Sequence, residues 1–478
     1  MNKPLDYLIS AIIKERAKED EPIKGGVITV SETVSVAASV YETIRNTLEF
    51  DEEHLLRRNA IRRILKRRLG EEKTEVLAAD LLRELIWARY LPNNQVPESM
   101  VQSLAQVLDK YEVLFDRIET KKHQGHDHYN WLIDMLSTEI EYTVVPPVVD
   151  EALASFAYQE LKKRMVWTSK IIAPEDQDMQ LYLAVHRSVL KSNLATLRFR
   201  ALTLFYPKWT KGQADSDVVQ EVAASLDKVI DSIYAQINHS GADQMYRLVR
   251  KHAVVFHVLK DISKDSAEAF SAAVISRDQD VLTQAIKKAA EDRYGRFRVR
   301  LRRSVVRAVV FLFFTKMLVA LLVEYPYEQL VLRATSYTPL ITNVVFHPIL
   351  LGVIGLTVRI PVKRNTQRIV EELSALVGLG TTDDFELIFN VRRAWAKGAL
   401  AVIFNLIYIM VFLVTIGLLS GFLYSLEFNA LSIVFFVFFL SLVMFFGLKI
   451  RNTKRELLVV EVGGGAISTF IDIIFLPI

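Results

Sequence analysis

The sequence predicts an all-α fold: a helical cytoplasmic region followed by a polytopic membrane domain of about four transmembrane helices. Residues 1–290 contain six glycines and few turn dipeptides, a pattern that favours long helices over a sheet. The rest of the chain holds four apolar segments close to the length of about 20 residues that a helix needs to cross a bilayer. These observations predict both the fold class and the order of its two parts.

Composition limits the classes of function. Of the 478 residues, 51% are hydrophobic and 24% are charged, and most of the charge lies before residue 290. A formal net charge of +4 does not indicate a nucleic-acid-binding protein. Because the chain has no cysteine, disulfides, thiolate metal sites and cysteine nucleophiles are excluded.

The charged region is predicted to fold as two helical subdomains, 1–145 and 146–290. Amphipathic patterns run through several segments, and polar or proline-containing breaks separate them. The segments are 75–91, 100–118, 148–165 and 217–237. The second subdomain is expected to begin near Pro146, within the break at 144–150.

The segment 52–69 is predicted to be a helix whose surface is largely basic. Leu56, Ala60 and Ile64 mark its apolar side. An anionic lipid surface is one interpretation of the charge, since each basic residue near such a surface contributes about 1 kcal/mol. We favour the alternative, a solvated face that pairs with acidic neighbours such as those at 51–53 and 71–75.

The sequence RYGRFRVRLRRSVVRAVVFLFF, residues 293–314, begins by alternating arginine with apolar residues, as in a strand. A helical pattern is longer, because apolar side chains recur at steps of three or four from residue 282 to residue 308. These side chains are Leu282, Ile286, Ala290, Tyr294, Phe297, Leu301, Val305 and Ala308. The longer pattern predicts one helix that continues from the cytoplasm into the bilayer, with Gly295 as its weakest point.

The membrane domain is predicted to cover residues 291–455. Its four spans are Ser304–Val323, Pro339–Ile360, Ala399–Leu423 and Leu431–Leu448. Basic residues are concentrated before the first span, in the middle loop 361–398 and after the fourth span. The two loops on the opposite side contain one basic residue, Arg333. By the positive-inside rule, the N-terminus and the middle loop are cytoplasmic in a bacterial-type inner membrane.

Both flanks of the membrane domain carry informative residues. The basic residues predicted to mark the membrane interface before the first span are Arg296, Arg298, Arg300, Arg302 and Arg303. At the other end, the apolar tail 456–478 contains Glu461, Asp472 and three successive glycines, which argue against an ordinary fifth span. We predict a re-entrant segment or an incomplete span there.

Three histidines in the polar segment 121–130 are candidate metal ligands: His123, His126 and His128. Imidazoles bind zinc or nickel, and Asp127 offers a carboxylate beside them. The spacing matches no closed tetrahedral site, and a catalytic zinc needs supporting hydrogen bonds that a sequence does not show. We therefore favour a solvated loop over a metal site.

Polar residues inside the predicted spans are rare: Lys316, Asn343, His347 and Asn405. Ionisable groups in a bilayer are costly, and such residues commonly mark an ion or substrate path. Glu461 or Asp472 is a candidate partner for Lys316 if the tail enters the bilayer. The alternative, which we favour, is a lysine that reaches the interface and polar side chains that bond between helices.

Two further patterns concern helix packing. Gly417 and Gly421 have the spacing that allows two helices to approach closely, within one molecule or in a homo-oligomer. In the middle loop, Thr382 or Asp383 is a candidate cap for a helix in which Ile388 and Trp395 share a face. We expect that helix to lie at the cytoplasmic interface.

The sequence contains no phosphate-binding, zinc-protease or nucleophile-elbow motif. We therefore predict no cofactor and a non-enzymatic role: a membrane-anchored scaffold or adaptor whose helical region binds a protein partner. The expected partners are the lipid bilayer and that protein, and not nucleic acid. The alternatives are a channel or transporter subunit that uses Lys316 and His347, and a membrane-embedded enzyme that acts on lipids.

Overall fold

The computed structural model describes residues 3–19, 25–31, 53–119, 125–333, 337–358, 362–379, 386–390 and 399–459. These residues are almost entirely helical, which confirms the predicted all-α fold class. The chain divides into two compact units. Unit 1 contains Met1–Phe256, Ser263–Ile275 and Asp384–Val391, and unit 2 contains His257–Ile262, Ser276–Asp383 and Arg392–Ile478. A subdomain boundary at residues 145 and 146 stays a prediction.

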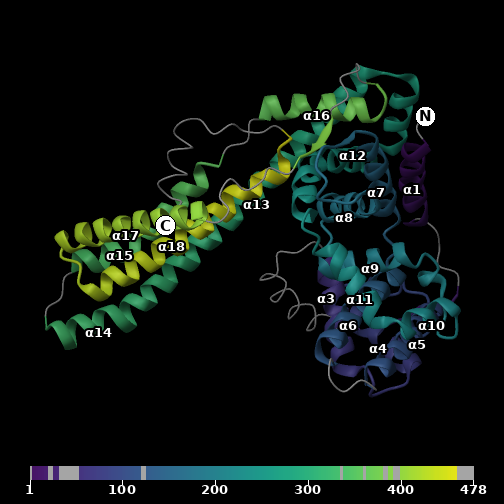
Figure 1. Cartoon of the computed structure of the whole chain (residues 1–478), viewed down its shortest axis with the longest axis horizontal. Helices are drawn as coiled ribbons and strands as arrows, with labels where there is room; N and C mark the ends of the chain where they lie inside the picture. Colours follow the sequence, from purple (N-terminus) through teal and green to yellow (C-terminus); the bar gives the residue numbers. More distant parts are fainter. Residues whose placement is uncertain are drawn as a thin grey trace. The chain divides into compact units, whose positions relative to one another are not determined.

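Unit 1 is built from packed helices (Figure 1). In chain order they are α1 (Lys3–Glu19), α3 (Glu53–Arg68), α4 (Thr74–Trp87), α5 (Ser99–Glu119), α6 (Gly125–Val144), α7 (Val148–Lys163), α8 (Pro174–Val189), α9 (Leu194–Phe205), the short 3₁₀ helix η1 (Trp209–Lys211), α10 (Asp217–Ala224), α11 (Leu226–Ile237) and most of α12 (Ala242–Ser276). Their lengths agree with the amphipathic patterns of the sequence.

The core of unit 1 follows from apolar residues spaced by one helical turn. In α4, Leu77, Leu81 and Leu85 recur every four residues and are at most 1% exposed. They belong to one apolar cluster with Trp131 of α6 and Trp209 of η1. Full burial of each leucine contributes about 1.5–3 kcal/mol to the stability of the folded unit.

The middle loop contributes a strand where the sequence predicted a helix. Strand β2 (Leu387–Phe389) pairs in parallel with β1 (Met165–Trp167), and both strands belong to unit 1. Leu387 and Phe389 are at most 2% exposed, whereas Ile388 between them is 51% exposed. That alternation is the period of a strand, so the expected helix containing Ile388 is wrong at these residues. Trp395 lies outside the described residues.

Unit 2 contains the apolar helices. Its elements are α13 (Gln279–Val319), the π-helical turn η2 (Ala320–Glu324), α14 (Tyr325–Tyr327), the π-helical turn η3 (Glu328–Leu332), α15 (Tyr337–Leu356), α16 (Val362–Leu376), α17 (Ala399–Ser425), α18 (Ala430–Thr453) and the 3₁₀ helix η4 (Lys454–Leu457). Figure 1 shows α13, α15 and α18 running alongside one another, with α14 near one end of that group.

Four helical stretches of unit 2 are long and apolar enough to cross a membrane, as the sequence predicted. They are Gln279–Leu332, Tyr337–Leu356, Val402–Ser425 and Ala430–Leu457. The first differs from the prediction at its C-terminal end, because the helix does not stop at residue 323. It continues through η2, α14 and η3 to Leu332, across the start of the segment that the sequence placed in a loop.

Helix α13 passes without a break through the arginine-rich segment, so the helical prediction for 293–314 is confirmed. The side chain of Asp278 caps the helix by accepting hydrogen bonds from the backbone N–H groups of Asp280 and Val281. Gly295 lies within this continuous helix. Tyr294 of the predicted apolar stripe is 2% exposed, and its hydroxyl accepts a hydrogen bond from Asn365 of α16.

Close approach between the apolar helices occurs at two glycines that the sequence analysis did not single out. A Cβ added at Gly355 of α15 would lie 2.6 Å from a methyl group of Val305 on α13. A Cβ at Gly447 of α18 would lie 3.0 Å from a methyl group of Ile354 on α15. These two glycines therefore set the spacing of α13, α15 and α18.

Helix α17 makes far fewer contacts than the other apolar helices. No residue of its 18-residue apolar window is buried, and α17 packs mainly against α18 next to their connecting turn. Nothing described lies within 4 Å of a Cβ at Gly417 or Gly421. A homo-oligomer contact through these two glycines stays a prediction.

Candidate functional site

A row of polar side chains lies between the apolar helices of unit 2, and we refer to it as the polar chain. Its members are Lys316, Glu324, Glu328, Asn343, Asn429 and Ser432. All except Asn429 are at most 2% exposed. Burial of this kind is costly for polar groups unless they are paired, so the contacts within the chain decide what the site can do.

The first half of the polar chain connects α13, η2 and α15. The Lys316 ammonium lies 3.5 Å from Oε1 of Glu324. The side-chain amide of Asn343 donates a hydrogen bond of 2.7 Å to the other oxygen of Glu324. Glu324 therefore lies beside the charged side chain of Lys316 on α13 and accepts a hydrogen bond from Asn343 on α15.

The second half reaches the start of α18. Asn343 Nδ2 also lies 3.5 Å from the backbone oxygen of Ser432. The side chain of Asn429 caps α18 by accepting a hydrogen bond of 2.9 Å from the backbone N–H of Ser432. The same side chain donates to Oε1 of Glu328 at 2.9 Å. Polar contacts therefore run without a gap from Lys316 to Glu328.

Aromatic side chains enclose the Lys316 end of the polar chain. The Lys316 ammonium lies 4.2 Å from the ring centre of Phe439 and 5.8 Å from that of Phe435. The electron-rich faces of these rings attract a cation in a place from which water is excluded. This arrangement holds the lysine inside the bundle, so the expectation that Lys316 reaches the interface is wrong.

His347 lies beside the polar chain, between α15 and α18. Its two ring nitrogens are 3.1 Å from the backbone oxygen of Asn343 and 3.0 Å from that of Phe436. The ring of Phe436 is 4.6 Å away, centre to centre. His347 therefore connects α15 and α18 through polar contacts. This agrees with the predicted alternative in which polar side chains of the spans bond between helices.

Asn343 and Ser432 each carry a buried side-chain oxygen that has no hydrogen-bond partner among the described residues. These oxygens are Oδ1 of Asn343 and Oγ of Ser432, on side chains that are 0% and 1% exposed. Buried polar atoms are nearly always paired, since leaving one unpaired costs about 1–3 kcal/mol. These two atoms therefore set this site apart from an ordinary packing contact.

Part of this site could be predicted from the sequence and part could not. Lys316, Asn343 and His347 come together as residues of one cluster, whereas Asn405 is exposed on α17. Glu324 was missed because it follows the apolar run directly, where a loop was predicted. Its spacing from Lys316 and Glu328 was the available signal, since steps of four and eight residues keep side chains on one helical face. Glu461 and Asp472 lie outside the described residues.

The helix that carries the two glutamates is irregular where they occur. Glu324 ends the π-helical turn η2, and Glu328 begins the π-helical turn η3. A π-helical turn is a rare distortion that changes which side chains face a neighbouring helix, and it is frequent at functional sites. In this chain the two turns coincide with the carboxylates of the polar chain.

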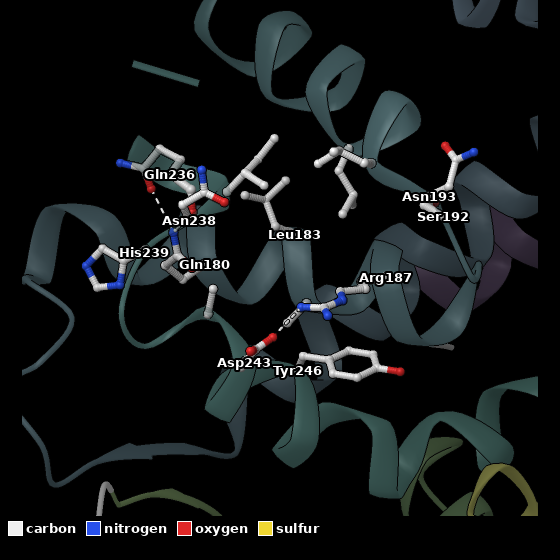
Figure 2. Close-up of a pocket in the computed structure, with 15 residues that line it drawn as sticks. Gln180, Leu183, Arg187, Ser192, Asn193, Gln236, Asn238, His239, Asp243 and Tyr246 are labelled. Atoms are coloured by element: carbon white, nitrogen blue, oxygen red, sulfur yellow. Dashed lines mark hydrogen bonds and ion pairs between the residues drawn. The ribbon is translucent and has the colours of Figure 1, made fainter. Parts of the chain in front are cut away.

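Unit 1 contains a separate pocket of about 510 Å³ (Figure 2). Its polar lining comes from α8, α11, the start of α12 and the connections that precede α9 and α12: Gln180, Arg187, Ser192, Asn193, Gln236, Asn238, His239, Asp243 and Tyr246. Figure 2 shows Arg187 directed toward Asp243 and next to the Tyr246 ring. The Arg187–Asp243 ion pair measures 2.8 Å, and the guanidinium carbon lies 4.2 Å from the ring centre.

Arg187 keeps hydrogen-bond donors that its contacts within the pocket do not use. The ion pair takes one N–H group of Arg187, and a guanidinium has five. The Arg187 side chain is 41% exposed, so the remaining donors are within reach of a ligand. Two turns earlier on α8, Gln180 donates hydrogen bonds to Gln236 and is 1% exposed, which makes that part of the wall rigid.

The other predicted sites have mixed outcomes. His123 and the His126 side chain lie outside what the structure describes, so a metal site there stays a prediction. Nδ1 of His128 is 4.0 Å from Asp227, and the described residues hold no group of three His, Cys, Asp or Glu side chains suited to a metal. The interface arginines of α13 are all exposed: Arg296, Arg298, Arg300, Arg302 and Arg303.

The basic helix α3 forms ion pairs, but it is not the fully solvated face beside residues 51–53 and 71–75 that we predicted. Arg57 is buried against Glu141 of α6 at 2.8 Å. Arg68 pairs with Asp80 of α4 at 2.6 Å, and this hydrogen-bonded contact lowers the pKa of Asp80. The main partners come from α4 and α6, because these helices pack against α3.

These features define a class of protein. A unit of four long apolar helices joined to a helical unit fits a multi-pass helical membrane protein. Comparisons of this chain with protein-family models, with characterised proteins and with solved structures found no match.

Proposed function

We propose that this chain is a multi-pass protein of a bacterial-type inner membrane that acts as a scaffold or adaptor. Its N-terminus and unit 1 lie in the cytoplasm, and unit 1 binds a protein partner at the pocket beside Arg187. The observation that carries the proposal is the pocket itself, which combines a rigid wall with an exposed guanidinium. A pocket of this size accommodates a short peptide segment.

Charge supports the proposed topology. The exposed arginines of α13 precede the first apolar span, and Lys363, Arg364 and Arg368 follow the second one. Both sets therefore lie on the same side of the membrane if the helices cross it in turn. The positive-inside rule assigns that side to the cytoplasm.

The chemistry of the pocket indicates the partner's binding group. Arg187 retains donors in the fork geometry that fits a carboxylate. Tyr246 holds the guanidinium in place through its ring, so few side-chain rotamers have to be ordered on binding. We propose that the partner presents an acidic side chain or a C-terminal carboxylate to Arg187.

The test is site-directed photocrosslinking of the full chain in native membranes. A photoreactive phenylalanine analogue replaces Leu194, which lines the pocket and is 47% exposed. The matched control replaces Leu204, which lies on the same helix, is 41% exposed and is not among the pocket residues. We expect one defined protein to be captured at 194 but not at 204, and Arg187→Glu to abolish its capture. Equal capture at both positions, or capture unaffected by Arg187→Glu, would contradict the proposal.

A second candidate function, a channel or transporter subunit, is favoured by the burial of Lys316 and Glu324 among the apolar helices. Its test is ion flux in vesicles that contain the purified protein. If the polar chain forms part of a conduction path, Lys316→Leu abolishes a flux that the unaltered protein supports. An unchanged flux in that variant removes this candidate.

A further inference from the structure

We propose that the polar chain of unit 2 contains a binding site for a monovalent alkali cation, formed by Asn343, Ser432 and Glu324. The site belongs to unit 2, so it does not depend on the scaffold function or on the pocket of unit 1. Three observations carry it: two unpaired buried oxygen atoms, a carboxylate that accepts a hydrogen bond from the amide carrying one of them, and the irregular helix that positions that carboxylate.

The unpaired atoms have the chemistry of cation ligands. Oδ1 of Asn343 is an amide oxygen, and Oγ of Ser432 is a hydroxyl oxygen; the residues that carry them are in contact with each other. The identity of the Asn343 oxygen is determined by its neighbours. Its Nδ2 faces Glu324 and the backbone oxygen of Ser432, which both accept hydrogen bonds, so the other atom of the amide must be the acceptor.

Glu324 supplies the charge that makes the ligand a cation. Lys316 lies 3.5 Å from this carboxylate, whereas a charge-assisted N–H···O bond is normally about 2.7–2.9 Å long. The lysine therefore neutralises Glu324 without saturating its oxygens. Carboxylate, amide and hydroxyl oxygens are hard ligands, which favour hard cations over zinc or other transition metals.

The preference for a monovalent ion follows from the charge of the ligands. Of the three proposed ligands only Glu324 has a carboxyl group, and Lys316 lies beside it at 3.5 Å. A divalent cation loses more hydration energy than a monovalent one when it enters a site without water. A second or third carboxylate ligand would be needed to offset that cost, and the proposed ligands include only one.

The backbone supports the same assignment. Glu324 is the last residue of the π-helical turn η2 and lies opposite Asn343 near the start of α15. Ion sites in helical membrane proteins commonly form where a helix departs from regular geometry, because such a break redirects side chains and backbone oxygens toward one point. Here the irregular turn places Glu324 next to Asn343, whose side-chain amide also carries one of the unpaired oxygens.

The test measures thermal unfolding of the full chain in detergent with NaCl or with an equal concentration of choline chloride. We expect the Tm to rise with Na⁺ in a saturable way and not with choline. Above the dissociation constant, each tenfold increase in Na⁺ should raise the Tm by roughly 3–5 °C. KCl and LiCl at the same ionic strength then rank the alkali ions.

Ser432→Ala is the decisive variant, because it removes only the unpaired hydroxyl oxygen. Ser441→Ala on the same helix is the matched control, since the Ser441 hydroxyl already donates to the backbone oxygen of Val437 at 3.0 Å. The Na⁺-dependent rise in Tm should be lost in the first variant and retained in the second. Asn343→Leu provides a second variant that should also lose it.

Four outcomes would overturn the assignment. The first two are the same Tm in NaCl and in choline chloride, and a Na⁺-dependent rise in Tm that persists in Ser432→Ala. The other two are a Tm that rises with Ca²⁺ but not with Na⁺, and a Tm that depends on pH but not on the cation. The last would show that the polar chain binds only a proton.

Discussion

The carboxylate of Glu324 is contacted by donors from two helices. The side-chain amide of Asn343 on α15 lies 2.7 Å from one of its oxygens, and the Lys316 ammonium on α13 lies 3.5 Å from the other. All three side chains are at most 1% exposed. The apolar helices of unit 2 are therefore joined at this point by charge and hydrogen bonds as well as by apolar packing. Breaking any one contact leaves a polar group where water cannot replace the lost partner.

The Lys316–Glu324 pair should be strongly coupled. Lys316→Met leaves Glu324 buried without its counter-charge, so the free energy of unfolding should fall by about 3–5 kcal/mol. Combining it with Glu324→Gln should recover part of that loss, because both charges are then absent. Unfolding of the unaltered protein, the two single variants and the double variant in a detergent titration gives the coupling energy between the two side chains. A double variant whose loss equals the sum of the two single losses would show that the pair contributes nothing.

The close approach of α15 and α13 should make Gly355 intolerant of a side chain. A Cβ there would be 2.6 Å from Val305, so Gly355→Ala should lower the free energy of unfolding by roughly 1–3 kcal/mol. Gly417→Ala is the control, because nothing described lies within 4 Å of a Cβ at that residue. Thermal unfolding in detergent measures both. If Gly417→Ala also destabilises the protein, and alters crosslinked oligomers, the predicted homo-oligomer contact is present.

In unit 1, Glu139 should be needed to keep Lys110 inside the core. Lys110 is 1% exposed and forms an ion pair with Glu139, which also accepts hydrogen bonds of 2.9 Å from Tyr111 and Trp209. Burial raises the pKa of Tyr111, which keeps its hydroxyl protonated as a donor. Glu139→Gln leaves the buried ammonium without a counter-charge and should lower the free energy of unfolding by about 3–5 kcal/mol.

Tryptophan fluorescence during denaturant unfolding measures that change. The matched control is Asp178→Asn, which breaks the Lys162–Asp178 pair, where the side chains are 49% and 60% exposed. Exposed pairs contribute little, so the control should change stability by no more than about 0.5 kcal/mol. Similar losses in the two variants would contradict the role assigned to Glu139.

His186 should make unit 1 less stable in acid. It is 1% exposed on α8, next to the Tyr182 ring, and burial lowers its pKa from 6.5 to about 3. The unfolded chain therefore takes up a proton near pH 6.5 that the folded chain accepts only near pH 3. The stability associated with neutral His186 is fully present above pH 6.5 and is lost progressively as the pH falls towards 3.

Denaturant unfolding at pH 7.5, 6, 5 and 4 checks this dependence in the unaltered protein and in His186→Phe. The variant has no proton to bind at that position, so its stability should fall less steeply between pH 6.5 and pH 4. His252→Gln, at a half-buried histidine of α12, serves as the control and should keep the unaltered slope. An identical pH dependence in His186→Phe would show that other groups cause the acid sensitivity.

The helices of this protein could be predicted because their signal is local. The apolar stripe from Leu282 to Ala308 repeats at the helical period over several turns, which is enough to outweigh the short strand-like pattern of the arginines. The long apolar segments were equally clear, and the structure places long helices at all four of them. Lys316, Asn343 and His347 could be selected because polar groups are rare in such segments.

The strand β2 and the acidic members of the polar chain could not be predicted in the same way. β2 is three residues long, and its neighbour Thr168 bonds to Phe389 across 221 residues of chain, so no local pattern identifies the pairing. Glu324 and Glu328 resembled loop residues because they follow an apolar run and flank Pro326. Their inward orientation depends on Asn343 and Asn429, which come from other helices.

The sequence by itself determined the all-α class, the positions of the four apolar helices and the rarity of polar groups inside them. Periodicity and hydropathy act over neighbouring residues, so a single chain segment contains that information. Only the tertiary structure decided which acid faces Lys316, which glycines let the helices approach, and which buried oxygens lack a partner. Those properties depend on the distances between atoms of different helices, and packing sets these distances.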